Sequence, residues 1–184
     1  MTGLNSVLRR HNAQYQLFAA REPIAGNGDP GNRILFLGED NPQSTLREHQ
    51  LFDHPPYCAG HRLRSAILRV PRSVYLSCWR GNLCSPAWSE MQAAETASQV
   101  FDGYATWRVV VMLGRKVARV MAKTHLVPAM RPFSRRACGS ITFVSLPHPS
   151  GQCRDWNEAR AYTRALAAMR SAAPSVAWGS EPPA

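Results

Sequence analysis

The sequence predicts an α/β fold built on a four-stranded parallel sheet. Four short apolar runs have the length and composition of buried strands: Arg33–Leu37, Ser73–Ser77, Arg108–Leu113 and Ile141–Leu146. Segments between them carry apolar residues three or four positions apart, which is the spacing of amphipathic helices. Apolar strands that alternate with such helices indicate a sheet covered on both faces, and therefore a three-layer α/β/α arrangement.

The chain before the first strand divides into a helix and a linker. Ser6–Ala20 has Val7, Tyr15 and Phe18 available for one helical face. Residues 22–32 follow, and they are rich in Gly, Pro, Asn and Asp, which predicts a loop. We therefore separate residues 1–32, as an N-terminal helix and linker, from the domain that follows.

Two helices are predicted in the first half of the domain. Gly60–Val70 places Leu63, Ile67 and Val70 on one face and arginines on the other. Further along, Ser89 and Gln92 form a capping box that begins a second helix. That helix is expected to bury Met91, Ala94 and Phe101.

Two more helices are predicted in the second half. The third strand turns at Gly114 into a basic helix, Arg115–Lys123, and Asp155 and Glu158 are expected to cap the last helix. The apolar face of the last helix consists of Tyr162, Leu166 and Met169. Beyond it the chain is rich in Pro, Ser and Gly, so we expect a domain over 33–171 and a disordered tail over 172–184.

The charge of the chain favours a polyanionic partner. Lys plus Arg number 22 and Asp plus Glu 12, which gives a net charge of +10. Lys116 and Lys123 are the only lysines, so nearly all the cations are arginines, whose planar guanidinium group suits phosphate oxygens. An arginine-rich proteome explains the choice of Arg over Lys but not the net charge. We therefore expect contact with nucleic acid.

Several other classes of protein are disfavoured. The five cysteines include no Cys-x-x-Cys pair and the histidines show no ligand spacing, so neither a metal nor another cofactor is expected. The longest apolar run is far shorter than the roughly 20 residues of a membrane helix. Charge within the first ten residues argues against a signal peptide, and we expect a cytoplasmic protein without membrane contact.

Two loops at predicted strand ends carry the most specific motifs. The loop after the first strand reads LGEDNPQS (residues 37–44), and the loop after the fourth reads LPHPSGQCR (residues 146–154). Ligands of parallel α/β sheets bind beyond the carboxyl ends of the strands, where these loops lie. Together the loops resemble the signature motifs of the uracil-DNA glycosylase superfamily. Its first motif is Gly-Gln-Asp-Pro-Tyr or Gly-Ile-Asn-Pro-Gly, and its second is His-Pro-Ser-Pro-Leu-Ser or Asn-Pro-Ser-Gly-Leu-Ser-Arg.

The resemblance implies a uracil-DNA glycosylase-like fold and a reaction. The enzyme would flip a base out of double-stranded DNA and hydrolyse its glycosidic bond, leaving an abasic site. His148 would donate to the leaving base, and Asn82 would read its Watson–Crick edge. Asp40 or Asn41 would position the attacking water, with Glu39 as a third option, because the first motif has one residue more than the family pattern.

The resemblance also implies contacts to the base and to the DNA backbone. Gln43 stands where the uracil-specific branch has a Tyr that closes off the pyrimidine 5-position, and Gln152 takes the place of a Leu wedge. Tyr57 is an aromatic residue available to stack on the flipped base. The backbone contacts fall to Ser44, Ser150, Gly151 and Arg154.

The identity of the base stays open at this point. A polar Gln43 favours a 5-substituted pyrimidine, and one antiphage branch of the superfamily removes glucosylated hydroxymethylcytosine from phage DNA. Uracil or mismatched thymine, removed in base excision repair, is the alternative. Two hypotheses belong to other functional classes. The protein is then either a DNA-binding or sensing module without catalysis or an enzyme that acts on free nucleotides. No Lys falls in either motif, so we expect a monofunctional enzyme, acting as a monomer.

Overall fold

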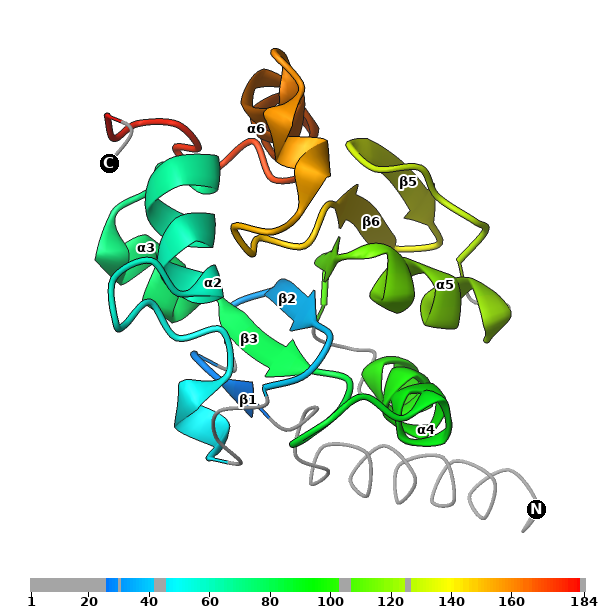
Figure 1. The fold of residues 1–184 in the computed structure, drawn as a ribbon. Helices are drawn as coiled ribbons and strands as arrows, with labels where there is room; N and C mark the ends of the chain where they lie inside the picture. The colour runs from blue at the N-terminus through cyan, green and yellow to red at the C-terminus, as the bar shows by residue number, and fades with distance from the viewer. Residues whose placement is uncertain (1–25, 30, 42–45, 103–106, 125–126, 183–184) are drawn as a thin grey trace, which may run out of the picture.

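A mixed sheet with four parallel strands at its centre organises the chain (Figure 1). The computed structural model describes residues 26–29, 31–41, 46–102, 107–124 and 127–182. Within these ranges six strands form one sheet in the order β1-β3-β2-β4-β6-β5. Their bounds are β1 (Gly26–Asn27), β2 (Ile34–Gly38), β3 (Trp79–Asn82), β4 (Val109–Leu113), β5 (Ser134–Cys138) and β6 (Ile141–Leu146).

The α/β class is confirmed, but the predicted four strands are too few. Strands β3, β2, β4 and β6 pair in parallel, and β1 and β5 add an antiparallel strand at each edge. The predictions over Arg33–Leu37, Arg108–Leu113 and Ile141–Leu146 match β2, β4 and β6 closely. These strands are apolar and buried throughout or nearly so, as expected for a sheet covered on both faces.

The strand predicted over Ser73–Ser77 is wrong. This segment is a helix, α3 (Arg72–Ser77), which begins after Pro71, and the second parallel strand starts only at Trp79. The helix turns Tyr75 into the core, where its hydroxyl donates to the Leu51 carbonyl at 2.6 Å. A short apolar run reads equally well as a strand or as a buried helical turn, so periodicity alone could not separate them.

The two edge strands arise in segments that carry no strand pattern. β1 lies inside the predicted linker and pairs Gly26 with Gly81 and Asn27 with Arg80. β5 has a mixed sequence, SRRAC, in which Arg135 and Arg136 are exposed. Cations on an edge strand discourage pairing with another chain, so these arginines suit the position.

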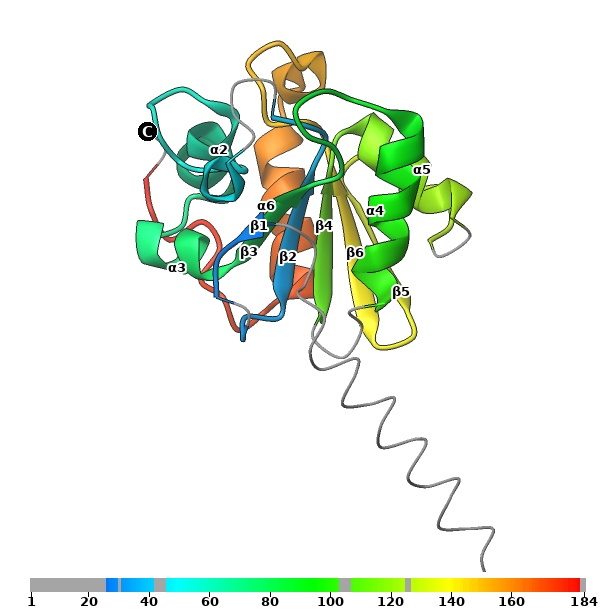
Figure 2. The same ribbon diagram turned by 90° about the horizontal axis from the view of Figure 1, so that it is seen from below.

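Helices cover both faces of the sheet, which confirms three layers (Figure 2). One face holds α2 (Ala59–Arg62), a π-helical turn η2 (Leu63–Leu68), α3 and α6 (Ala161–Ala172). The other face holds α4 (Glu90–Asp102) and α5 (Arg115–Lys123). Alternate strand residues serve the two cores: Phe36 and Val111 face the first set of helices, and Leu35 and Val110 face the second. No helix in the described ranges could cross a bilayer.

Helix α4 lies where it was predicted, but a different face of the helix is buried. Ser89 caps it as expected, since the Gln92 amide donates to the Ser89 hydroxyl at 3.4 Å. Its buried residues are Ala93, Ala97 and Val100, whereas Met91 is 74% exposed and Ala94 is exposed too. The side chain of Phe101 lies outside the described residues. Small alanines fit close against the sheet, and the sequence rule favoured the larger Met91.

The start of α6 also differs from the prediction. A 3₁₀ turn, η3 (Arg154–Asn157), comes before it, and Arg160 occupies the cap without a side-chain hydrogen bond. Asp155 instead pairs with Arg115 at 2.9 Å, and the Glu158 carboxylate pairs with Arg164 at 2.9 Å. Leu166 and Met169 are buried as predicted, whereas Tyr162 is 36% exposed. An extra turn thus carries both acids away from the cap position.

The tail predicted to be disordered packs on the core, with contacts that extend to Glu181. Trp178 is 3% exposed, its indole N–H donates to the Ala173 carbonyl at 2.8 Å, and its ring meets Phe36 edge-on. Backbone bonds join Gly179 to Leu68 and Glu181 to Arg69. One buried Trp offsets the polar composition that suggested disorder. The helix predicted over Ser6–Ala20 lies outside the described residues, as do 183–184.

Replacing Trp178 tests the docking of the tail. We expect Trp178→Ala to lower the free energy of unfolding by about 3–5 kcal/mol, the usual cost of emptying the site of a buried Trp. Met91→Ala serves as a control, because an exposed side chain changes stability by no more than about 0.5 kcal/mol. Urea unfolding followed by far-UV circular dichroism measures both. Equal stability of the two variants would show that the tail is not part of the cooperative core.

Candidate functional site

A cleft of about 820 Å³ opens beyond the carboxyl ends of the parallel strands. From β2 the chain passes to β3 on one side, and it then returns past β2 to β4 on the other. Such a reversal leaves a crevice at the strand ends, which is where α/β proteins bind ligands. The residues that line the cleft are Asp40, Asn41, His49, Leu51, Phe52, His54, Pro55, Cys58, Ala59, Gly60, Asn82, His148, Ser150, Gly151 and Gln152.

Seven of the residues singled out from the sequence meet in this cleft. They come from three separate loops: Asp40 and Asn41 after β2, Asn82 at the end of β3, and His148, Ser150, Gly151 and Gln152 after β6. The loops after β2 and β3 are tied together by backbone bonds from Leu83 to Gly38 and from Cys84 to Glu39, both 3.0 Å long. The two motif loops therefore face one common space.

Of the other four predicted residues, two lie outside the described residues and two do not line the cleft. Gln43 and Ser44 lie outside the described residues. Tyr57 is 91% exposed and does not line the cleft, although its chain neighbours Pro55 and Cys58 do. Arg154 is exposed in η3, also beyond the lining. The expected stacking of Tyr57 on a base inside the cleft is therefore not reproduced.

Local hydrogen bonds fix the orientation and the tautomer of His148. The backbone N–H of Ser150 donates to His148 Nδ1 at 3.2 Å, so this nitrogen acts as an acceptor. In the neutral ring the proton then resides on Nε2. The indole of Trp156 donates to the His148 carbonyl at 2.8 Å and holds the backbone in place. His148 therefore presents Nε2–H as its free donor.

The surroundings keep His148 neutral. Burial lowers its pKa, the Glu39 and Asp40 carboxylates oppose that shift, and Lys116 adds to it. Lys116 also pairs with Glu39 at 3.3 Å and lies over the Trp88 ring at 5.2 Å from its centroid. The pair partly neutralises the charge beside the imidazole, which leaves burial as the largest influence.

The three polar residues after β2 have different environments. Glu39 is engaged by Lys116, does not line the cleft, and faces Gly114, where any side chain would collide with its carboxylate. Gly114 has a φ of 104°, which also favours glycine. Asn41 lines the cleft and donates from Nδ2 to the His49 carbonyl at 3.2 Å. Asp40 lines the cleft and stands near enough to His148 to raise its pKa.

Asn82 carries a buried oxygen without a hydrogen bond to any described residue. The residue is 6% exposed, its backbone N–H donates to Gln50 Oε1 at 2.9 Å, and its Oδ1 is left unsatisfied. Oδ1 lies against Gly38, where a Cβ would collide with it. A buried acceptor without a partner costs about 1–3 kcal/mol, which a ligand donor in the cleft would recover.

One wall of the cleft, formed by His49–Gly60, was missed by sequence reasoning. This segment contains turn formers and two adjacent prolines, and the only residue in it that sequence analysis selected, Tyr57, does not line the cleft. Two ion pairs anchor it: the buried Asp53 carboxylate lies 3.1 Å from Arg64 Nε, and it accepts a hydrogen bond from Arg72 Nε at 2.9 Å. The Cys58 sulfur accepts from the His61 amide at the start of α2. These contacts connect distant segments, so no local pattern predicts them.

The described part of the chain contains no group of three or more His, Cys, Asp or Glu side chains that could hold a metal ion. The described lining of the cleft offers carboxylate, amide, imidazole, hydroxyl and thiol groups. Comparison of the chain with protein-family models finds no match, and a search of curated proteins finds none either.

The titration of His148 tests the electrostatics of the site. We expect its pKa to lie below the ordinary value of about 6.5, and Lys116→Ala to raise it, because Glu39 and Asp40 then act unopposed. Lys123→Ala removes another cation of α5, one that pairs with Glu90 of α4. This variant should leave the pKa of His148 unchanged. NMR titration of the ring protons, assigned with His148→Gln, measures the pKa. A midpoint above 6.5 in the wild type would contradict the assignment.

The same shift has a defined effect on stability. With a lowered folded-state pKa, the unfolded chain binds more protons than the folded one between that pKa and about 6.5. The contribution of His148 to stability is therefore complete above about pH 6.5. It is lost as the pH falls through this window.

Proposed function

We propose that this protein is a monofunctional DNA glycosylase that extrudes a pyrimidine nucleotide from duplex DNA and hydrolyses its N-glycosidic bond. The observation that carries the proposal is the meeting of Asp40, Asn41, Asn82 and His148 in one cleft. The resemblance of their loops to the uracil-DNA glycosylase motifs and the net charge of +10 add support. The three-layer α/β/α architecture is compatible with a uracil-DNA glycosylase-like fold.

His148 is suited to stabilise the departing base. When the bond between C1′ and the pyrimidine nitrogen breaks, its electron pair leaves with the base, and negative charge develops on the base carbonyl oxygens. A neutral imidazole that presents Nε2–H can donate to such an oxygen without first losing a proton. The accepting role of Nδ1 toward Ser150 favours this tautomer over the other.

Asp40 is the best candidate to orient the attacking water. Glycosidic cleavage passes through an oxocarbenium-like sugar, which a nearby carboxylate stabilises while it takes up the proton of the water. Asp40 lines the cleft, whereas Glu39 is held by Lys116 outside it. Asn41, which is bonded to the His49 carbonyl, has the amide chemistry of a positioning group. The products are an abasic deoxyribose and the free base.

Asn82 is suited to read the base. Asn82 lines the cleft, and its buried Oδ1, which accepts from no described residue, would complement a donor on the Watson–Crick edge of a pyrimidine. Cytosine offers its exocyclic amino group there, and uracil offers its ring N–H. A base that fills this position satisfies an acceptor that is otherwise buried without a partner.

The dimensions of the cleft favour a substituted base. A volume of about 820 Å³ lies toward the upper end of the range of roughly 300–1,000 Å³ in which proteins hold ligands of moderate size. An unsubstituted pyrimidine occupies a small part of it. We therefore propose glucosylated hydroxymethylcytosine of phage DNA as the substrate, with a role in antiviral defence. Uracil and mismatched thymine remain the alternatives.

The lysine nearest to the catalytic residues does not favour a Schiff-base mechanism. Lys116 pairs with Glu39 and lies over Trp88, and it does not line the cleft. An amine that attacks C1′ needs to reach the sugar and to lose its proton. The ion pair opposes both requirements, so hydrolysis by water without strand cleavage is the proposed outcome.

A panel of modified DNA substrates tests the function. Duplexes with uracil or a G·T mismatch, and phage genomes with glucosylated hydroxymethylcytosine, are incubated with the protein and scored for alkali-labile sites. We expect sites in the glucosylated DNA and a loss of about 10²- to 10³-fold in single-turnover rate for His148→Ala, as for an oxyanion donor. His61→Ala, a histidine outside the cleft lining, is the matched control.

The outcomes separate the competing functions. Sites in uracil DNA but not in glucosylated DNA would overturn the proposed substrate and keep the reaction. Tight DNA binding without excision of any base would favour a sensing module. An unchanged rate for His148→Ala would remove this residue from the leaving-group role.

Variants of the first loop identify the water-positioning residue. We expect Asp40→Asn to lower the single-turnover excision rate by about 10²- to 10⁴-fold, because the carboxylate that accepts the proton is lost. Asn41→Ala should cost less, since it removes only a positioning contact. DNA affinity, measured by fluorescence anisotropy, should change little in either variant. A greater rate loss in Asn41→Ala than in Asp40→Asn would exchange the two roles.

A further inference from the structure

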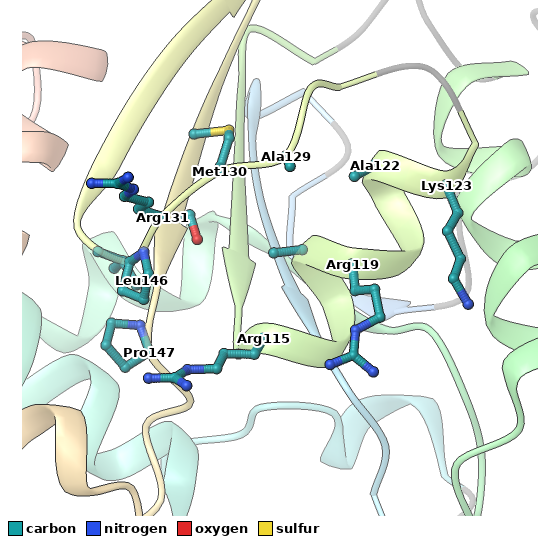
Figure 3. A pocket seen from close by; sticks show the side chains of 13 residues that line it. Arg115, Arg119, Ala122, Lys123, Ala129, Met130, Arg131, Leu146 and Pro147 are labelled. Carbon is teal, nitrogen blue, oxygen red and sulfur yellow. The ribbon is translucent and has the colours of Figure 1, made fainter.

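A second depression, of about 650 Å³, lies beside the cleft and carries a row of cations (Figure 3). Helix α5 forms one side, the segment Ala129–Pro132 forms the opposite side, and the end of β6 forms the floor. We call it the basic groove. Its lining residues are Gly114, Arg115, Ala118, Arg119, Ala122, Lys123, Ala129, Met130, Arg131, Pro132, Ser145, Leu146 and Pro147.

Helical spacing aligns the cations along the groove. Arg115, Arg119 and Lys123 follow one another at intervals of four residues, which places them on one face of α5. Arg131 stands on the opposite side. The lining contains no Asp or Glu, so the potential inside the groove is positive.

Acidic residues pair with the two ends of the row. Arg115 pairs with Asp155 at 2.9 Å, and Lys123 pairs with Glu90 at 2.8 Å. Arg119 and Arg131 are exposed, and neither forms an ion pair with a described residue. The middle of the groove thus presents two guanidinium groups available to an anionic ligand.

Between the cations, the described lining of the groove is an apolar surface without an aromatic ring. Ala118, Ala122, Met130, Leu146 and Pro147 supply most of it. Grooves that bind bases of single strands do so by stacking them on aromatic side chains. This lining suits instead the sugar and phosphate groups of a strand, which need apolar contact and positive charge but no ring.

The groove adjoins the cleft through two neighbouring segments. Pro147 lines the groove and the next residue, His148, lines the cleft. Gly114, at the other side of this junction, donates its N–H to the Leu146 carbonyl at 2.8 Å. A strand whose nucleotide enters the cleft at His148 would meet the groove directly.

We infer that the basic groove binds the sugar–phosphate backbone of the DNA strand that flanks the extruded nucleotide. The inference rests on the proposed function for the choice of DNA as the polyanion. The row from Arg115 to Lys123 spans eight residues, or about 12 Å at a rise of 1.5 Å each. Each strand of a duplex carries one phosphate per about 3.4 Å of helix axis, so a row of this length can face more than one phosphate of the strand. A single phosphate would occupy only part of it.

Neutralising the two free guanidinium groups tests the groove. We expect Arg119→Gln/Arg131→Gln to weaken binding of an unmodified fluorescein-labelled duplex by roughly tenfold to a hundredfold at 0.1 M salt. The slope of log K against log salt should fall by about 2 in magnitude, one for each lost phosphate contact. Arg135→Gln/Arg136→Gln on β5 is the matched control, since it removes the same charge outside the groove.

Fluorescence anisotropy measures binding, and single-turnover excision at saturating protein measures the reaction. We expect the groove variant to keep the excision rate of the wild type and to need more protein for half-saturation. Equal losses of affinity in the groove and control variants would overturn the proposed role of the groove, because the lower net charge alone would explain both losses. Polyglutamate of the same length serves as a competing polyanion. If it binds as tightly as the duplex, the proposal that the groove binds DNA fails, and an acidic polypeptide becomes the favoured ligand.

The two proposals fail in distinguishable ways. If no base of the panel is excised but the groove variant still binds the duplex more weakly than the control, the glycosylase proposal fails and the groove stands. If excision occurs and both double variants bind DNA like the wild type, the groove fails and the glycosylase proposal stands.

Discussion

The parallel pairing of β2 with β3 on one side and β4 on the other is the constraint on which the rest of the structure depends. Its register sets Gly38 opposite Asn82 and Leu37 opposite Met112, and the β4–β6 pairing sets Leu113 opposite Leu146. Four strands therefore end at nearly one level. Asp40, Asn41, Asn82 and His148 therefore leave the backbone within a few residues of that level, although the sequence separates them by up to about a hundred positions.

Much of this arrangement could be predicted from the sequence, because its signals are local. Buried parallel strands are apolar throughout, so β2, β4 and β6 are visible as short runs, and Gly114 marks the turn into α5. The incorrect predictions concern segments whose structure depends on contacts between distant parts of the chain. Whether Ser73–Ser77 becomes a helix, or Trp178 docks, depends on contacts with Leu51 and Phe36, which lie outside any local window around these segments.

Some features of the cleft could likewise be predicted from local sequence, whereas others depend on long-range packing. Motif spacing identified the residues after β2 and β6, because those loops follow strands that the sequence reveals. The wall His49–Gly60 and the Lys116–Glu39 pair depend on chain packing, and the charge state of His148 depends on them in turn. The sequence thus indicates which groups meet in the cleft, whereas the tertiary structure determines their tautomer, their ion pairs and their exposure.

The docking of Trp178 also bears on how the chain matures during its synthesis. The indole packs against Phe36, and Gly179 and Glu181 bond to Leu68 and Arg69, beside the helices that form part of the cleft wall. Domains generally fold as units during translation. The ribosome must therefore release almost all of the described chain before this side of the core can close. Until then the edge of Phe36 that the indole covers stays exposed, and the bonds of the tail to Leu68 and Arg69 stay unformed.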